Sequence, residues 1–376
     1  MVKDNNQNVF FELLRCGLWE KEALLASFVD IDYSAIYNLA EKQSVVGLIT
    51  AGLEQVKDVK VPQVWSLQFV GATLQIEQRN KAMNAFIEKL IEKLRQVGVY
   101  TLLVKGQGVA QCYERPNWRS CGDVDLFLSS DNYEKAKTFL TPLAQYKEDE
   151  DIKRQHLGLT IDGWVVELHG TLYSRLSKRV DRGIEEAHKD VFYGGNVRSW
   201  RCGKTQVFLP GVDSDVIFVF THILQHYFAG GIGLRQICDW CRLLWTYQDK
   251  IDRRLLEQRI RKMRLTTEWK AFAAIAVNWV GIPAEAMPYF DEKDNQNKSL
   301  QRKADKIITL VLDAGNFGQG RDDSFKKKYP KIITYFISLG VFTKYALIQF
   351  SIFPVAAIKG WLRAIKLGVK SKLRNC

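Results

Sequence analysis

The strongest constraint on the fold is a change in hydrophobic spacing near the middle of the chain. Before residue 99 and after Pro210, apolar residues recur every three or four positions, which is typical of amphipathic helices. Between these points the apolar runs are short, as in "HLGLTIDGWVVELHG", where Asp162-Gly163 favours a two-residue hairpin turn. We therefore expect an α+β fold with a small mixed-sheet core flanked by N- and C-terminal helical segments.

The same change in spacing divides the chain into four expected regions. Residues 1–98 form an N-terminal helical region, and residues 99–205 form the core that contains the sheet. A second helical region spans residues 206–325, and a basic amphipathic tail spans residues 326–376.

Positive charge is concentrated in the tail. The formal net charge is +12, but eleven Lys or Arg and no Asp or Glu lie in residues 326–376. The first 325 residues therefore carry a formal net charge of only +1, which disfavours nucleic acid as a partner.

Two features favour a reducing, cytoplasmic location. The first residues, "MVKDNNQNVF", lack the basic-then-apolar pattern of a signal peptide. Among seven cysteines, Cys238 and Cys241 form the one C-x-x-C pair, so we expect buried reduced thiols rather than a zinc site.

Two aspartates interrupt an apolar strand in "RSCGDVDLFL", residues 119–128. Asp123 and Asp125 are two positions apart, so their side chains share one face of the strand. Burying an unpaired carboxylate costs several kcal/mol, and a positive group should therefore lie opposite them. The alternative is a strand-end pair that is exposed to water or bonded to Arg119.

A third carboxylate follows in the predicted hairpin, whose second strand places Glu167 and His169 on one face. Three carboxylates on neighbouring strands can bind Mg²⁺, with Mn²⁺ as the alternative. Two such ions can stabilise the attacking and leaving oxygens of an in-line displacement at phosphorus. We predict that Asp123, Asp125 and Glu167 form this metal site and that His169 orients Glu167. An exposed hairpin glutamate is the alternative interpretation of Glu167.

A candidate phosphate-binding turn ends the apolar run "VYTLLVKG". The backbone N–H groups from Gly106 to Gly108, at the start of a short helix, would suit phosphate oxygens. Lys105 or Arg119 could neutralise the leaving pyrophosphate. Alternatively, both cations could pair with the aspartates.

Polar residues within the second helical region are candidates for binding the acceptor, the group that would attack the phosphorus. His222 and His226 are four positions apart and share a helix face, and Asp239 could extend them into a second metal site. Because apolar residues surround them, we prefer hydrogen-bonded histidines that pack beside the core or line an acceptor pocket. Arg235 and Asp239 are further candidate acceptor contacts.

Together, "LLVKGQGVAQCYERPNWRSCGDVDLFL", "VVELHG" and "HILQHYFAGGIGLRQICDW" carry a family resemblance. The chain resembles the uncharacterised nucleotidyltransferase family, whose members share K-G, R-x-x-x-D-h-D and E-h-H patterns (h, apolar). That family looks like a branch of the DNA polymerase beta-type nucleotidyltransferase superfamily. The resemblance covers roughly residues 10–290 and is carried by the motifs as a set.

The resemblance implies a Mg²⁺-dependent reaction in which a nucleoside monophosphate is transferred from a nucleoside triphosphate to an acceptor and pyrophosphate is released. ATP is the favoured donor, and the acceptor group is an unidentified hydroxyl or phosphate. It implies that Asp123 and Asp125 bind the metals, that Glu167 is the third carboxylate, and that Gly106 lies on the nucleotide-phosphate turn. The superfamily usually has Gly-Ser or Gly-Gly at that turn, where this chain has Gly106-Gln107. Residues 99–205 would then be the catalytic core, with residues 206–325 on the acceptor side.

The altered turn and the basic tail leave a second hypothesis. The chain could be a catalytically inactive, membrane-docked scaffold or binding protein of this fold, acting in surface-polysaccharide or secondary-metabolite assembly.

The tail has the pattern of a helix that lies in an anionic membrane interface at the inner face. On a helical wheel its apolar residues fall in one sector: Ile358, Trp361, Leu362, Ile365, Val369 and Leu373. Its basic residues share another: Lys359, Arg363, Lys366, Lys370 and Arg374. The alternative is a surface helix that packs on the body or on a partner. Upstream, Lys344 and Pro354 interrupt an apolar stretch, so we expect no clean membrane-spanning helix.

Overall fold

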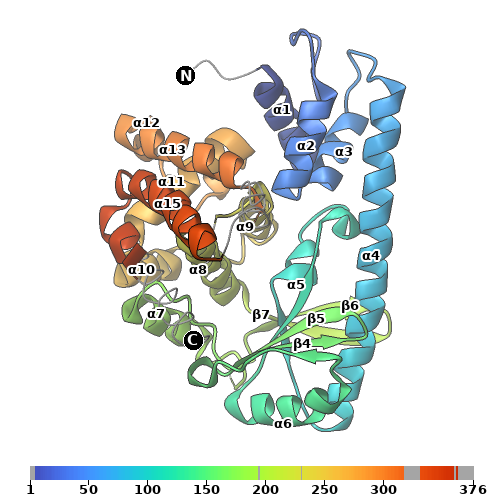
Figure 1. Ribbon diagram of the computed structural model, residues 1–376, viewed down its shortest axis with the longest axis vertical. Coiled ribbons are helices and arrows are strands. Elements are labelled where there is room, and N and C mark those ends of the chain that lie inside the picture. Colours follow the sequence, from blue (N-terminus) through green and yellow to red (C-terminus); the bar gives the residue numbers. More distant parts are fainter. Residues whose placement is uncertain (1–4, 194, 230, 317–330, 360, 363–376) are drawn as a thin grey trace.

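The computed structural model describes residues 5–193, 195–229, 231–316, 331–359 and 361–362 (Figure 1). A seven-stranded mixed sheet lies on one side, and helices precede it, cover it and follow it. The predicted α+β class is therefore confirmed.

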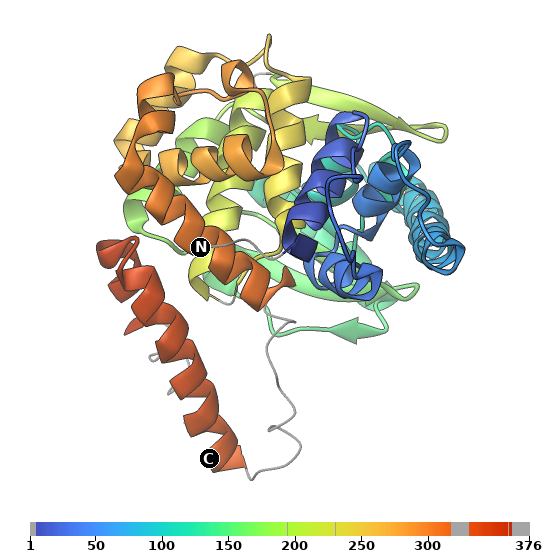
Figure 2. The ribbon, with the colours of Figure 1, turned by 90° about the horizontal axis from the view of Figure 1, so that it is seen from above.

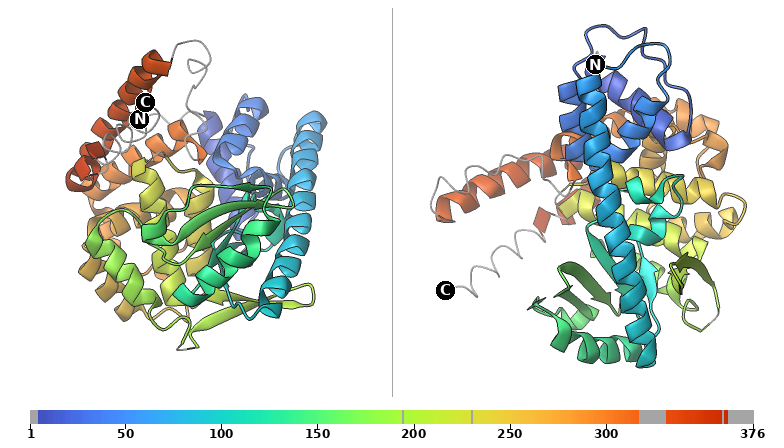
Figure 3. Two further views of the ribbon diagram at one scale, coloured as in Figure 1. Left: turned by 60° about the horizontal axis from the view of Figure 1, so that its bottom comes forward. Right: turned by 90° about the vertical axis from the view of Figure 1, so that its right-hand side faces the viewer.

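Four helices precede the sheet, as their hydrophobic spacing predicts: α1 (Asn5–Trp19), α2 (Tyr33–Gln43), α3 (Val46–Glu54) and α4 (Gln63–Gln96). The side chain of Asp32 caps α2 by accepting the backbone N–H of Ala35 at 3.0 Å, which satisfies one of the helix's free donors. The 34-residue α4 runs from this helical bundle down along the sheet (Figure 3). It thereby joins the two parts of the molecule.

The sheet has the strand order β3-β4-β5-β2-β1-β7-β6. Its strands are β1 (Leu102–Val104), β2 (Asp123–Phe127), β3 (Tyr146–Lys147), β4 (His156–Ile161), β5 (Trp164–His169), β6 (Val197–Cys202) and β7 (Thr205–Pro210). The β4–β5 hairpin is confirmed, and Asp162 and Gly163 have φ values of 51° and 77°, as a type I′ turn requires. Strand β2 is antiparallel to β1 and parallel to β5, so it lies at the centre of the sheet.

The two faces of β2 have different chemistry because side chains alternate along a strand. Val124 and Leu126 belong to an apolar core together with Val166 and Leu168 of β5. Helix α4 and helix α6 (Ser130–Leu140) supply the other half of this core, for example Tyr133. The aspartates of β2 therefore face away from α4 and α6, on the side covered by the C-terminal helices.

Two short helices follow strands β1 and β2. Ser129 caps α6, because it keeps an extended backbone while its Oγ accepts the N–H of Asn132. Helix α5 (Gly106–Ala110) begins at the Lys-Gly turn, where the sequence predicts a short helix.

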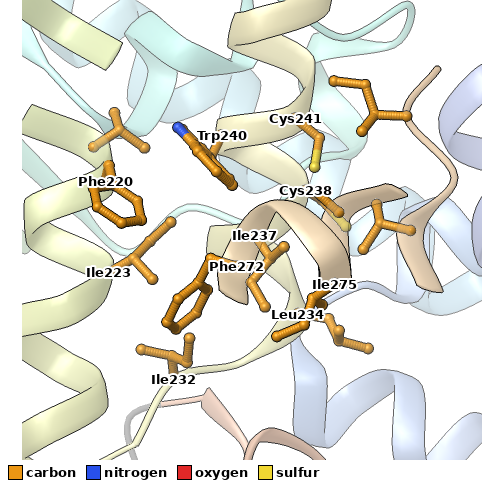
Figure 4. Packing of buried hydrophobic residues seen from close by; sticks show 14 of the residues in the cluster. Phe220, Ile223, Ile232, Leu234, Ile237, Cys238, Trp240, Cys241, Phe272 and Ile275 are labelled. Atoms are coloured by element: carbon orange, nitrogen blue, oxygen red, sulfur yellow. The ribbon is translucent and has the colours of Figure 1, made fainter. Parts of the chain in front are cut away.

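Further α-helices are α7 (Lys178–His188), α8 (Val212–Ala229), α9 (Leu234–Thr246), α10 (Arg253–Met263), α11 (Thr266–Ile275), α12 (Glu292–Gln296), α13 (Lys298–Ala314) and α15 (Lys331–Phe350). Helices α8, α9 and α11 enclose a second core, where Phe220, Trp240 and Phe272 meet (Figure 4). Cys238 and Cys241 are buried in this core. This packing fixes the orientation of α8 and α9 toward the sheet.

Helix α15 extends away from the body along much of its length (Figure 2). Its last turn is anchored, because Gln349 Nε2 donates to the carbonyl of Tyr227 at 2.6 Å and Phe353 is buried beyond it. Among the described residues, no helix has both the length and the apolarity needed to cross a membrane. Most of the basic sector of the predicted tail helix, from Arg363 onward, lies outside the described residues.

Candidate active site

Strand pairing brings the three predicted carboxylates together. In the parallel register of β2 and β5, Asp125 is the Cα partner of Glu167, and Asp123 lies two positions away on the same face. One carboxylate oxygen from each of the three residues lies within 4.8 Å of the others. This spacing is compatible with shared coordination of a cation.

Lys105 is in direct contact with this cluster. It follows β1 with a φ of 55°, a rare conformation for a residue with a side chain, and its Nζ lies 2.8 Å from Asp125 Oδ1. Burial lowers the pKa of the ammonium group, but the charges of Asp125, Asp123 and Glu167 outweigh burial and raise it. Lys105 is therefore charged. Its ion pair with Asp125 corresponds to the alternative interpretation of the sequence, in which Lys105 pairs with an aspartate.

Asp123 has no ion pair with Lys or Arg in the part of the chain that the structure describes. The neighbouring charge of Asp125, together with burial, raises the pKa of its carboxyl group. Burial lowers the pKa of His169, but hydrogen bonds to Asp125 and Glu167 outweigh burial and raise it, so Lys105 and His169 together offset part of the charge of the three carboxylates. Their oxygen donors fit Mg²⁺ or Mn²⁺, and a divalent cation would supply the missing positive charge.

Two histidines hold the cluster from the side of the hairpin. His169 Nε2 lies 2.9 Å from Asp125 Oδ1 and 3.4 Å from Glu167 Oε2, while His156 Nε2 lies 3.4 Å from the same Glu167 oxygen. Burial raises the pKa of Glu167, but the hydrogen bonds from His156 and His169 outweigh it and keep the pKa well below its usual value. Glu167 is therefore ionised and oriented.

His156 was missed by the sequence reasoning, although a signal for it was available. A two-residue turn at Asp162-Gly163 fixes the register of the hairpin and places His156 opposite His169. The ligating atoms of His156, Glu167 and His169 form a second group within 4.8 Å, which shares its carboxylate with the first.

Helix α8 supplies the opposite wall. His222 Nε2 lies 3.3 Å from Lys105 Nζ and 3.0 Å from His226 Nε2. Burial lowers the pKa of both imidazoles, that of His226 to about 4, so both are neutral at pH 7. His222 and His226 are thus hydrogen-bonded to each other, and their place on the acceptor side stays a prediction.

A cavity of about 300 Å³ lies between the carboxylates and α8. Asp123 and Glu167 lie on its sheet side, and His226 lies on its helix side. Arg154, at the end of the 3₁₀-helix Ile152–Arg154, and Arg175, in the connection after β5, also line it. Their guanidinium groups lie 3.4 and 3.9 Å from the Asp151 carboxylate. The spacing of the sequence carried no signal for these two arginines.

Arg119 and Asp239 bind each other, and both line a small cavity of about 50 Å³ that Asp123 and Asp125 also line. Asp239 accepts from Arg119 Nε at 2.9 Å and Arg119 Nη2 at 2.6 Å, and also from the Tyr113 hydroxyl at 2.8 Å. Burial raises the pKa of Asp239, but the Arg119 charge outweighs it and lowers the pKa. Arg235 lies nearby, and its Nη1 donates to the carbonyl of Ser120 at 2.6 Å. The structure therefore gives Arg119 and Asp239 a shared role in joining α9 to the loop before β2.

The predicted phosphate turn is tightly packed. Gly106 has a φ of 38°, and a Cβ there would lie 3.2 Å from Cys121 Sγ. A Cβ on Gly108 would lie 2.9 Å from Leu209 Cδ2, so Gly108 allows α5 to approach the sheet. Gln107 is buried and its Nε2 donates to Asn80 Oδ1 of α4 at 2.8 Å. Phosphate binding by Gly106 and Gly108 stays a prediction.

A central Asp-x-Asp strand, a glutamate on its parallel neighbour and a Lys-Gly turn at the end of an adjoining strand define an α+β core of the nucleotidyltransferase class. The sequence model of the uncharacterised nucleotidyltransferase family matches residues 30–281, and the chain belongs to this family. No curated protein and no solved structure matches the chain.

Proposed function

We propose that the protein is a divalent-metal-dependent nucleotidyltransferase that moves a nucleoside monophosphate from a nucleoside triphosphate to an acceptor. The observation that carries this proposal is the meeting of three carboxylates within 4.8 Å beside one lysine, at a cavity of about 300 Å³. Asp123, Asp125 and Glu167 would hold Mg²⁺, or Mn²⁺. When bound, such cations stabilise the charge that develops on the α-phosphate and orient the triphosphate.

The residues around the carboxylates would position the reaction. Lys105 and His169 fix Asp125 from two directions, so that its second oxygen stays directed at the cation site. Arg154 and Arg175 would bind the β- and γ-phosphates of ATP or another nucleoside triphosphate. An acceptor oxygen then bonds to the α-phosphorus, the bond from phosphorus to the bridging oxygen breaks, and pyrophosphate leaves with the electron pair.

The test compares the wild type with Asp123→Asn and Asp125→Asn. Asp149→Asn is the matched control because Asp149 is exposed and lies outside the site. Each protein is incubated with one α-labelled nucleoside triphosphate, Mg²⁺ or Mn²⁺ and a cell extract, and labelled product and pyrophosphate are measured. We expect both from the wild type and the control, and neither from the site variants.

Two results would decide against transfer. If the wild type binds metal–nucleotide in calorimetry but releases no pyrophosphate with any fraction of the extract, the scaffold hypothesis gains support. If it binds no metal–nucleotide, or if both site variants behave like the control, the carboxylates are not a nucleotide site.

We also propose that the basic tail docks the protein on an anionic membrane surface at its cytoplasmic face. The concentration of eleven Lys or Arg in residues 326–376 supports this, because each basic residue near such a surface contributes about 1 kcal/mol. A chain that ends at residue 362 keeps the anchored residues Gln349 and Phe353 and six of the eleven basic residues, and removes the other five. Flotation with phosphatidylserine vesicles should be weakened in this variant, and equal flotation of both proteins would contradict the proposal.

A further inference from the structure

A second and larger cavity, of about 740 Å³, adjoins the candidate active site. It lies between α7, α8, the α10–α11 corner and residues 355–359. Its apolar walls include Val180, Leu224, Phe228 and Met263, all of which are buried. The volume is within the range of cavities that bind small molecules, and the walls favour an apolar ligand.

The same cavity carries an excess of positive charge. Among the described residues, Arg175, Arg179, Arg264 and Lys359 line it together with one carboxylate, that of Glu268, while Asp151 lies 3.9 Å from Arg175. Both Arg175 and Arg179 are exposed, so their guanidinium groups are accessible to a ligand at the mouth. Several arginines around an apolar cavity favour a ligand that joins an apolar part to a phosphate dianion, since guanidinium binds phosphate through paired hydrogen bonds.

The two cavities meet at shared residues. Arg175 and Gln225 line both the 740 Å³ cavity and the smaller cavity that contains Asp123 and Glu167. A phosphate held at Arg175 by a ligand in the larger cavity would therefore lie at the entrance to the carboxylate site. This continuity places the larger cavity on the acceptor side of the proposed reaction.

We propose that the larger cavity binds the acceptor, and that the acceptor is a phosphate monoester of an apolar alcohol. The proposal rests on the nucleotidyltransferase function above and adds the chemical class of the acceptor. The apolar part lies against Leu224, Phe228 and Met263, and the phosphate lies beside Arg175. A phosphate oxygen bonds to the α-phosphorus and pyrophosphate leaves, so the product contains a new phosphoanhydride. No proton has to be removed, because this oxygen is already ionised at neutral pH.

The binding test uses decyl phosphate below its micelle-forming concentration, with calorimetry on the full chain. Decanol and inorganic phosphate, which carry one half of the probe each, serve as ligand controls. We expect decyl phosphate to bind at least about tenfold more tightly than either, since both the apolar wall and the arginines contribute. Equal affinity for decyl phosphate and decanol would overturn the proposal.

Two cavity variants test the location. Ala229→Trp places a large side chain at the end of α8 inside the cavity, and Arg179→Glu reverses a charge at its rim. Lys178→Glu is the matched control, because it makes the same charge change one residue away and outside the cavity lining. We expect Ala229→Trp and Arg179→Glu to weaken decyl phosphate binding about tenfold or more, and Lys178→Glu to leave it unchanged. Uniform affinity across all three variants would overturn the assignment.

Nucleotide binding separates this proposal from the function on which it rests. Binding of ATP with Mn²⁺ should be retained in Ala229→Trp and lost in Asp123→Asn, whereas decyl phosphate binding should show the opposite pattern. If Ala229→Trp instead loses ATP and keeps decyl phosphate, the larger cavity holds the nucleoside and the proposal fails while the transferase function stands. Binding of monomeric decyl phosphate alone indicates a soluble acceptor. Arg179-dependent flotation with vesicles that contain decyl phosphate indicates a lipid acceptor.

Discussion

The buried pair of Arg119 and Asp239 offers a stability test with a defined magnitude. Two hydrogen bonds of 2.9 and 2.6 Å join the guanidinium to the carboxylate, and both side chains are buried. Removing one partner leaves an uncompensated buried charge, which typically costs 3–5 kcal/mol. We therefore expect Asp239→Leu and Arg119→Met each to lower the free energy of unfolding by about that amount.

The double variant should lose much less than the two single variants together. It buries no unpaired charge, and its main remaining defect is the Tyr113 hydroxyl, which loses its acceptor Asp239 at a cost of about 1–3 kcal/mol. The coupling energy between the two positions should therefore be at least about 3 kcal/mol. Tyr113→Phe in the double-variant background should recover most of the remaining loss.

The measurement is urea unfolding, followed by circular dichroism and by tryptophan fluorescence to check that the two probes agree. A coupling energy below about 0.5 kcal/mol would refute the argument that this pair joins α9 to the loop before β2. If Arg119→Met instead keeps its stability and loses affinity for metal–ATP, then Arg119 acts as the nucleotide contact that the sequence predicts.

Four further substitutions have defined outcomes. Asp125→Asn should destabilise the fold by about 3 kcal/mol in urea unfolding because Lys105 loses its buried partner, whereas Asp123→Asn should be neutral or stabilising because a repulsion is removed. Burial lowers the pKa of His188 from 6.5 to about 4, so the unfolded state binds the proton first. This histidine alone should lower the unfolding free energy by about 2 kcal/mol from pH 8 to pH 5, and His188→Phe should reduce the total loss over this range by that amount. His156→Ala should weaken Mn²⁺ binding more than Mg²⁺ binding in calorimetry, because imidazole favours transition metals.

Local pattern predicted much of the fold. Two-residue periodicity and the Asp162-Gly163 turn were sufficient for the β4–β5 hairpin, and helical spacing was sufficient for the long α4. The parallel pairing of β2 with β5 depends on the packing of α4 and α6 over both strands, which no local pattern encodes. The prediction that Asp125 and Glu167 are neighbours therefore came from chemistry and the family resemblance rather than from strand signals.

The site shows where sequence reasoning stops. Lys105, Asp125 and Glu167 share one region because their strands are adjacent, and the motifs pointed to them. Arg119 and Asp239 are 120 positions apart, and their pairing follows from how α9 docks on the core. Arg175 lies in a connection with a φ of 61°, and only the folded chain brings it to the junction of two cavities.

The carboxylates are held unequally, and this difference bears on how a cation would act. Asp125 is almost completely buried and is fixed by Lys105 and His169, so its position does not depend on a ligand. Asp123 is not paired with Lys or Arg in the described chain and is repelled by Asp125. A divalent cation between the two carboxylates would replace this repulsion with attraction. Cation binding would therefore also stabilise the folded state at this position. The strand that carries both aspartates is therefore organised in advance at Asp125, and a bound cation would order it further at Asp123.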